Sequence, residues 1–141
     1  MEPLTLPGTL DSLGKIGQYI MSAAKEAGLE KKASYKLRLA VDEIATNIII
    51  HGYNEAGLSG NIYLEVKRDE QSLTIYLEDT AIPYDPTKAE AVTEETLKKP
   101  LEERPIGGLG VYLAEEGVDE FMYERVGDRN RNILVVNLAK I

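Results

Sequence analysis

The spacing of the apolar residues changes near the middle of the chain, and this change restricts the folds that the chain can adopt. Between about Lys31 and Ile50 the apolar residues recur with the period of an α-helix, which predicts an amphipathic helix. From Ile62 to Leu77 apolar and polar residues alternate instead, on both sides of a polar turn at residues 69–72, which predicts an antiparallel β-hairpin. The chain must therefore pack a helix against a sheet.

Further elements flank this helix and hairpin. The predicted elements are, in chain order, an edge strand at residues 2–6, a helix capped by Thr9 or Asp11 that ends near Gly28, the helix at 31–50, the hairpin at 62–77, a short helix at 109–116, and a closing hairpin formed by 121–125 and 133–138. Helices must then cover one face of a mixed, mainly antiparallel sheet. The predicted fold class is α+β, a two-layer α/β sandwich.

The segment from about residue 81 to residue 106 has prolines and many charges but no clear period. A loop of this length inside a compact domain is usually functional. We therefore predict that it is a lid over a binding site, within a single domain that spans residues 1–141.

Composition narrows the function. The formal net charge is −8, and a field of that sign repels phosphate backbones, so we expect no nucleic-acid partner. No apolar run is long enough to span a bilayer, so we expect no membrane partner. The absence of cysteine excludes disulfides and thiolate chemistry, and it is compatible with the cytoplasmic location that we expect.

Three polar positions are candidates for chemistry. Glu43 and Asn47 lie four residues apart on the predicted second helix, so both project from one face. The carboxylate could orient a nucleophile and the amide could bind hydrated Mg²⁺, although two solvated neighbours would show the same spacing. Asp79 ends the hairpin, where a carboxylate can accept a hydrogen bond from an exocyclic amine or can simply begin a turn.

Glycines open the predicted helix at 109–116. The run Gly107-Gly108-Leu109-Gly110 leaves backbone N–H groups exposed at a helix start, which favours an anion such as phosphate. A flexible hinge would have the same composition. No Gly-Lys-Ser/Thr follows, so the run is not a Walker loop.

In combination, these motifs resemble a known family. Glu43-x-x-x-Asn47, then Asp79, then the long loop and the glycine run are similar to the asparagine box and two glycine boxes of the gyrase/chaperone/histidine-kinase (GHKL) ATPase class. The finer resemblance is to the anti-sigma-factor serine/threonine kinases. It rests on Leu39-Ala40-Val41-Asp42-Glu43-Ile44-Ala45-Thr46-Asn47-Ile48-Ile49-Ile50-His51-Gly52-Tyr53 and on Asp79-Thr80-Ala81-Ile82-Pro83-Tyr84-Asp85-Pro86.

The resemblance implies a role for each motif. Asn47 would coordinate Mg²⁺, Glu43 would be the general base, and Asp79, with Ala81 beside it, would bind adenine. Gly107, Gly108 and Gly110 would line the ATP phosphates. A cation would steady the transferring phosphate, either Arg104 or one of Lys98 and Lys99.

Two positions depart from the family pattern. Ala81 stands where the first glycine box usually has glycine. Its methyl group could crowd adenine, and a side chain there would be strained if the backbone required a positive φ. The usual threonine of the last strand pair is absent, and Asn132 is the nearest polar candidate. A protein-interaction module that has lost nucleotide binding is therefore an alternative.

The resemblance also implies partners. An ATP-dependent kinase of this family would phosphorylate a small anti-sigma-factor antagonist and would also bind a sigma factor. A plain ATP hydrolase is the third hypothesis, and such enzymes usually need further domains. A homodimer is compatible with the resemblance, and the edge strand at residues 2–6 could contribute to it; the sequence does not decide between dimer and monomer.

Overall fold

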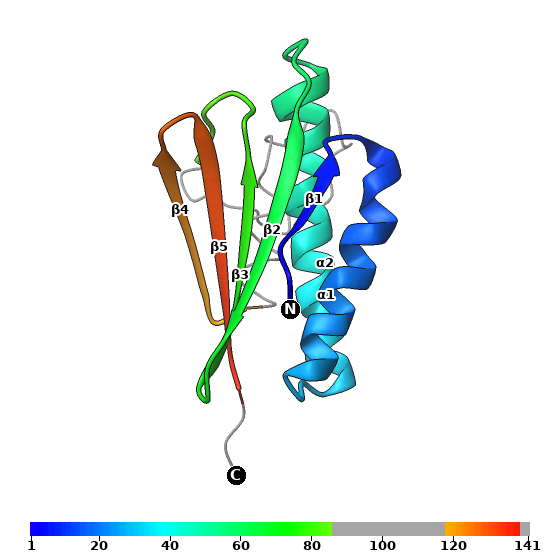
Figure 1. Ribbon diagram of the computed structural model, residues 1–141, viewed down its shortest axis with the longest axis vertical. Helices are drawn as coiled ribbons and strands as arrows, with labels where there is room; N and C mark the ends of the chain where they lie inside the picture. Colours follow the sequence, from blue (N-terminus) through cyan, green and yellow to red (C-terminus); the bar gives the residue numbers. More distant parts are fainter. Residues whose placement is uncertain (86–117, 139–141) are drawn as a thin grey trace, which may run out of the picture.

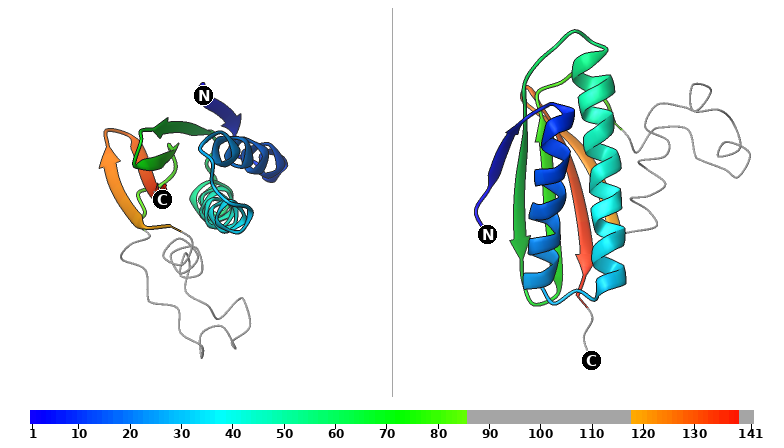
Figure 2. Two further views of the ribbon diagram at one scale, coloured as in Figure 1. Left: turned by 90° about the horizontal axis from the view of Figure 1, so that it is seen from below. Right: turned by 90° about the vertical axis from the view of Figure 1, so that its right-hand side faces the viewer.

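The computed structural model describes residues 1–85 and 118–138. In these ranges five strands form one sheet, and helices pack on one of its faces (Figures 1 and 2). The elements are β1 (Leu4–Pro7), a 3₁₀ turn (Leu10–Ser12), α1 (Leu13–Glu26), α2 (Lys31–Asn47), a π-helical extension of α2 (Ile48–Asn54), β2 (Asn61–Arg68), β3 (Ser72–Asp79), β4 (Glu120–Val126) and β5 (Arg129–Asn137). The α+β fold class predicted from the sequence is confirmed.

The sheet has the strand order β1-β2-β3-β5-β4, and every pairing among the described strands is antiparallel. β4 and β5 are joined by a two-residue turn in which Gly127 has a φ of 61°, a conformation that glycine adopts without strain. β5 lies between β3 and β4, so residues near the start of β5 lie beside the end of β3. This order brings together segments that are far apart in the sequence.

The core lies between the sheet and the two helices. Along β3, Leu73, Ile75 and Leu77 point to the helices and are buried, while the residues between them are half-buried on the other face. Figure 2 shows α1 on the side of β1 and α2 on the side of β4. The buried apolar residues of the two helices include Ile16, Ile20, Leu37, Val41 and Ile44.

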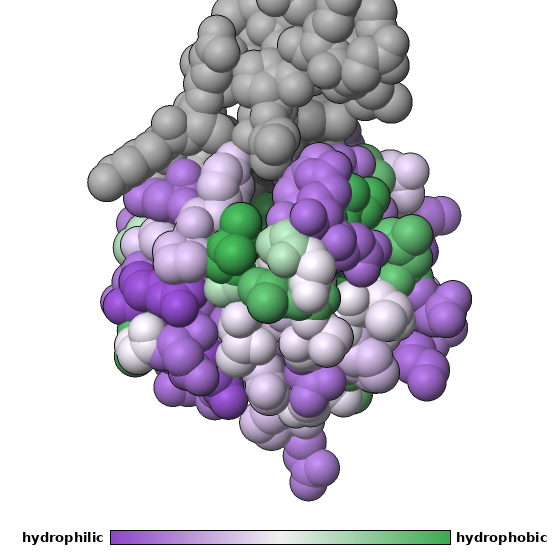
Figure 3. Space-filling model, turned by 90° about the horizontal axis from the view of Figure 1, so that it is seen from above, coloured by the Kyte–Doolittle hydropathy of each residue, from purple (hydrophilic) through white to green (hydrophobic). Residues whose placement is uncertain are grey.

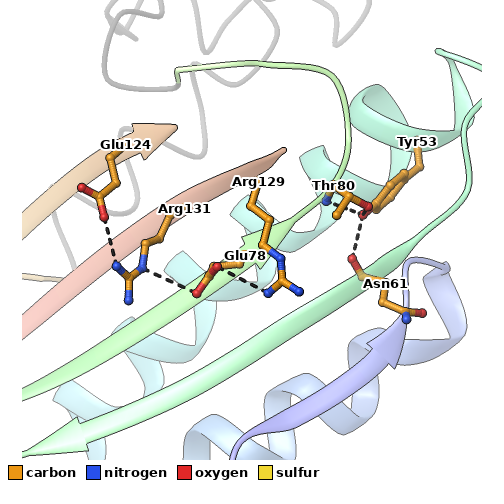
Figure 4. Close-up of polar contacts among 7 residues, drawn as sticks. All are labelled: Tyr53, Asn61, Glu78, Thr80, Glu124, Arg129 and Arg131. Atoms are coloured by element: carbon orange, nitrogen blue, oxygen red, sulfur yellow. Dashed lines mark hydrogen bonds and ion pairs between the residues drawn. The ribbon is translucent and has the colours of Figure 1, made fainter. Parts of the chain in front are cut away.

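Charged and aromatic side chains contact one another on the outer face of the sheet, opposite the helices. Glu78 lies between Arg129 and Arg131, with N–O distances of 3.6 and 3.5 Å, and Arg131 also contacts Glu124 at 3.0 Å (Figure 4). The Arg129 guanidinium lies 3.9 Å from the centre of the Tyr63 ring. These contacts link β2, β3, β5 and β4 across the solvent side.

The helix boundaries differ from the predicted ones. α1 begins at Leu13, after a 3₁₀ turn, and neither Thr9 nor Asp11 caps it; Thr9 precedes the turn without a side-chain capping bond. Ser12, at the junction, is buried and donates to the carbonyl of Pro7 at 2.6 Å. α2 ends at Asn47, where the helix widens into the π-helical extension. Periodicity alone does not distinguish these helical forms.

Some predictions concern residues that the structure does not describe. Residues 86–117 include the predicted helix at 109–116 and nearly all of the predicted lid. Across the described ranges, no helix is both long enough and apolar enough to cross a membrane.

Tyr53 joins the end of the helical layer to the sheet. Its side chain is buried, with 1% of its surface exposed, and its ring packs so closely against Gly8 and Gly60 that a Cβ at either glycine would lie within 3 Å of it. The hydroxyl donates to the carbonyl of Asn61 at 2.7 Å and accepts from the backbone N–H of Thr80 at 2.8 Å (Figure 4). One side chain thus links the π-helical extension to β2 and to the residue after β3.

We predict that Tyr53→Phe lowers the free energy of unfolding by about 1–3 kcal/mol, because the Thr80 N–H and the Asn61 carbonyl lose a partner inside the fold. Tyr35→Phe is the matched control, since the Tyr35 side chain is 55% exposed. Urea unfolding of both variants would measure the difference. Equal stability of Tyr53→Phe and wild type would contradict the role assigned to this hydroxyl.

Candidate functional site

The end of β3 carries a buried carboxylate. Asp79 is 1% exposed, on the face of the sheet that meets the helices. Its Oδ1 accepts from the backbone N–H of Ala81 at 3.0 Å and from Nδ2 of Asn130 at 2.9 Å. Its Oδ2 is buried and has no hydrogen-bond partner among the residues described. A buried acceptor of this kind is rare and suits a ligand that brings a donor.

Burial raises the pKa of the Asp79 carboxyl above its ordinary value, because charge is costly away from water. The hydrogen bonds from Asn130 and Ala81 and the positive charge of Arg125 lower this pKa, without cancelling the effect of burial. Glu78 raises it slightly. The site therefore favours a ligand that donates a hydrogen bond to the carboxylate and so compensates for its desolvation.

Asn130, opposite Asp79 on β5, connects the carboxylate to the segment that follows it. Its Nδ2 also donates to the carbonyls of Ile82 at 2.9 Å and Ala81 at 3.3 Å. Its Oδ1 accepts from the backbone N–H of Tyr84 at 3.2 Å and from the Tyr123 hydroxyl. The three acceptors around Nδ2 and the two donors around Oδ1 define the orientation of the amide.

Ala81 is accommodated without backbone strain. No non-glycine residue in the described part of the chain has a positive φ, so Ala81 is not in the left-handed conformation that would disfavour a side chain. Its methyl group is buried and lies against Gly52 of the π-helical extension, where an added Cβ would approach it to 2.8 Å. Gly52 thus leaves the space that the methyl group at position 81 occupies.

Glu43 and Asn47 lie on the last turns of α2, which runs toward the same end of the fold as β3 (Figure 1). Both side chains are half-buried. Burial raises the pKa of the Glu43 carboxyl, and the neighbouring Asp42 raises it further. A carboxylate with a raised pKa is a better proton acceptor, which is the property a general base needs.

The oxygen atoms of Glu43 and Asn47 suit Mg²⁺ only where waters and nucleotide phosphates supply most of its ligands. In residues 1–85 and 118–138 no group of three or more His, Cys, Asp or Glu side chains could hold a metal ion. Mg²⁺ commonly binds through one or two protein oxygens, several waters and the phosphates of a nucleotide. Asn47, half-buried near Glu43, could supply one such oxygen.

The surface at this end of the fold is partly apolar. Figure 3 views the molecule from the end where β3 stops, and apolar side chains gather near its centre between hydrophilic ones. Leu58, before β2, is 46% exposed, and Ile82, after β3, is 45% exposed. Because the Ile82 carbonyl accepts a hydrogen bond from Asn130, the exposed Ile82 places apolar surface next to the buried polar groups.

One residue of this site, Asn130, is not identified by the sequence analysis. Asn130, and not Asn132, contacts Asp79; Asn132 is also buried, but it lies opposite Leu77, one inward-facing position farther along β5. The alternating pattern of β5 contains a signal for this contact, because Asn130 and Asn132 occupy inward positions of a strand that continues with Leu134 and Val136. A polar residue at such a position needs a partner.

The remaining predicted site residues fall outside the described part of the chain. They are Lys98, Lys99, Arg104, Gly107, Gly108 and Gly110.

In the described residues two helices cover an antiparallel sheet, and the extension of α2 contacts the residues that follow the buried aspartate at the end of β3. Residues 6–137 match the histidine kinase-like ATPase domain. The chain belongs to this family.

Within the family the chain is similar to serine-protein kinases. It is 25% identical, over 118 residues, to the serine-protein kinase RsbW of Bacillus cereus (strain AH187). The matched segment covers 83% of this chain and 72% of the Bacillus protein. The serine-protein kinases RsbW of Bacillus mycoides (strain KBAB4) and Bacillus anthracis (strain A0248) match to the same extent. The printed names of these relatives agree with the kinase part of the resemblance noted in the motifs.

We predict that Gly52→Ala destabilises the protein by about 1–3 kcal/mol, because the new methyl group would overlap that of Ala81. In an Ala81→Gly background the same substitution should be neutral or stabilising, since alanine favours helical backbone more than glycine does. A double-mutant cycle followed by urea unfolding measures this coupling. Additive effects of the two substitutions would show that the side-chain space at 81 and 52 is not shared.

Proposed function

We propose that this protein is an ATP-dependent serine/threonine kinase of the anti-sigma-factor type, which phosphorylates a small antagonist protein. The observation that supports this most directly is the buried Asp79 carboxylate, which has one oxygen unpaired among the described residues. It lies at the end of the fold toward which α2, the helix that carries Glu43 and Asn47, also runs (Figure 1). The similarity to serine-protein kinases supports the choice of reaction.

In this proposal Asp79 recognises the nucleotide base. The exocyclic amine of adenine donates to Oδ2, the acceptor that no described residue satisfies. Such a bond offsets part of the cost of burying the carboxylate. Ala81, whose methyl group lies against Gly52, forms the adjacent wall without occupying a strained conformation.

Glu43 acts as the general base in the phosphoryl transfer. Its carboxylate accepts the proton of the substrate hydroxyl as that oxygen bonds to the γ-phosphorus, and the bond from the γ-phosphorus to the β–γ bridging oxygen breaks to release ADP. The raised pKa of Glu43 favours this proton transfer.

Asn47 binds Mg²⁺ in the proposal. When bound, the ion neutralises part of the phosphate charge that develops during transfer. By the same resemblance, Gly107, Gly108 and Gly110 contact the phosphates, and Arg104 steadies the transferring group. The phosphoacceptor is an anti-sigma-factor antagonist, and a sigma factor is a second partner.

A nucleotide-blind interaction module was the alternative suggested by Ala81. Its physical basis was strain or crowding at that position, and the structure has neither a positive φ nor an exposed methyl group there. The kinase proposal is therefore preferred.

We predict that Glu43→Gln lowers the rate of phosphate transfer from radiolabelled ATP to an antagonist protein by about 10²-fold or more, because the proton acceptor is lost. The affinity for MgATP should stay within about threefold of wild type, since the base is needed only in the transition state. The matched control is Glu26→Gln, an exposed glutamate at the end of α1.

Transfer at the wild-type rate by Glu43→Gln would exclude Glu43 as the general base. If wild-type protein binds the antagonist equally well with and without ATP and never phosphorylates it, the interaction module is the correct function.

A further inference from the structure

Five hydrogen bonds converge on the Asn130 side chain, and they join three separate segments. One bond reaches Asp79, three reach the backbone of residues 81–84, and one comes from Tyr123 on β4. The side chain is 3% exposed. It therefore connects the carboxylate, the segment after it and the edge strand through a single amide.

We propose that Asn130 is a positioning residue for base recognition, which holds Oδ1 of Asp79 so that Oδ2 remains the acceptor presented to the ligand. The inference rests on the proposed nucleotide site, and it assigns to Asn130 the discrimination between a base with an exocyclic amine and one without it.

The geometry supports this role in two ways. A carboxylate that is free to rotate would hold neither oxygen in a fixed direction, but the bonds from Asn130 and from the Ala81 N–H both end on one oxygen, Oδ1, and so fix the orientation of the group. Rotation about the side-chain bond would break both. The other carboxylate oxygen is thereby kept as the unpaired acceptor.

The same amide sets the path of the chain after β3. Nδ2 binds the carbonyls of Ala81 and Ile82, while Oδ1 binds the N–H of Tyr84. The orientation of Asp79 and the position of residues 81–84 are thus coupled through Asn130. Loss of the amide should disturb recognition of the base more than contacts to the phosphates.

Nucleotide pairs distinguish positioning from general destabilisation. ITP carries a carbonyl oxygen where ATP carries the amine. The ratio of their affinities therefore measures how strongly Oδ2 favours a base with an exocyclic amine. Titration calorimetry with Mg²⁺ and each nucleotide should show that wild type prefers ATP. In Asn130→Ala we expect ATP affinity to fall about tenfold or more, with ITP affinity within about threefold of wild type.

Two further variants protect the test against loss of folding. Val136→Ala truncates a buried residue on the same face of β5, six positions away, and should lower stability without changing the ATP/ITP ratio. Asn130→Asp keeps the acceptor for Tyr84 and Tyr123 but loses the Nδ2 donor. It should lower the ratio of ATP affinity to ITP affinity, as Asn130→Ala does.

The pH dependence of ATP binding gives an independent readout. Asn130 lowers the pKa of Asp79, so Asn130→Ala should move the loss of ATP affinity at acidic pH to a higher pH. Among the residues described, the charged groups that act on Asp79 are Arg125 and Glu78. Tyr53 and Tyr123 are nearby and neutral, since burial raises both tyrosine pKa values.

An equal fall in ATP and ITP affinity in Asn130→Ala, or a collapsed ratio in Val136→Ala, would overturn the positioning role while leaving the nucleotide site intact. Failure of the wild-type protein to bind ATP would overturn the proposed function itself. A selective loss of ATP binding, with the shifted pH profile, supports the inference.

Discussion

A carboxylate removed from water at the end of β3 is the constraint on which this end of the fold depends. Burial of a charge is costly unless it is paired or hydrogen-bonded, and Asp79 has only one oxygen satisfied among the residues described. The bonds from Asn130 and the Ala81 N–H, together with the charge of Arg125, offset part of that cost. A hydrogen-bond donor on a ligand would offset the remaining cost of burying the carboxylate.

The neighbouring contacts explain why the helical layer and the sheet meet closely here. The Tyr53 hydroxyl bonds to the backbone of the first residue of β2 and of the residue after β3, and Gly52 leaves room for the Ala81 methyl group. Because these contacts join the extension of α2 to the end of β3, they also place Glu43 and Asn47 toward the end of the fold where Asp79 lies (Figure 1). Packing and the candidate chemistry therefore depend on the same residues.

Hydrophobic period was sufficient to predict the two helices, the central hairpin and the two-layer class, since each has a long regular stripe. It could not predict the 3₁₀ turn before α1 or the π-helical extension after α2, because these forms differ in hydrogen bonding rather than in pattern. The role of Asn130 depends on pairing across β3 and β5, which arises from a sheet order that period does not reveal. Ala81 suggested strain because it replaces a glycine of the family pattern. The space that Gly52 leaves for its methyl group could not be foreseen, because the two residues are distant in sequence.

The central claim is that the site around Asp79 and Asn47 binds MgATP. Thermal unfolding with and without about 1 mM MgATP tests it directly, because a site with a Kd near 10 μM adds about 2.7 kcal/mol of stability. We expect a rise in Tm of about 6 to 12 °C that requires Mg²⁺ and is lost in Asn47→Ala. An unchanged Tm at several millimolar nucleotide would contradict it.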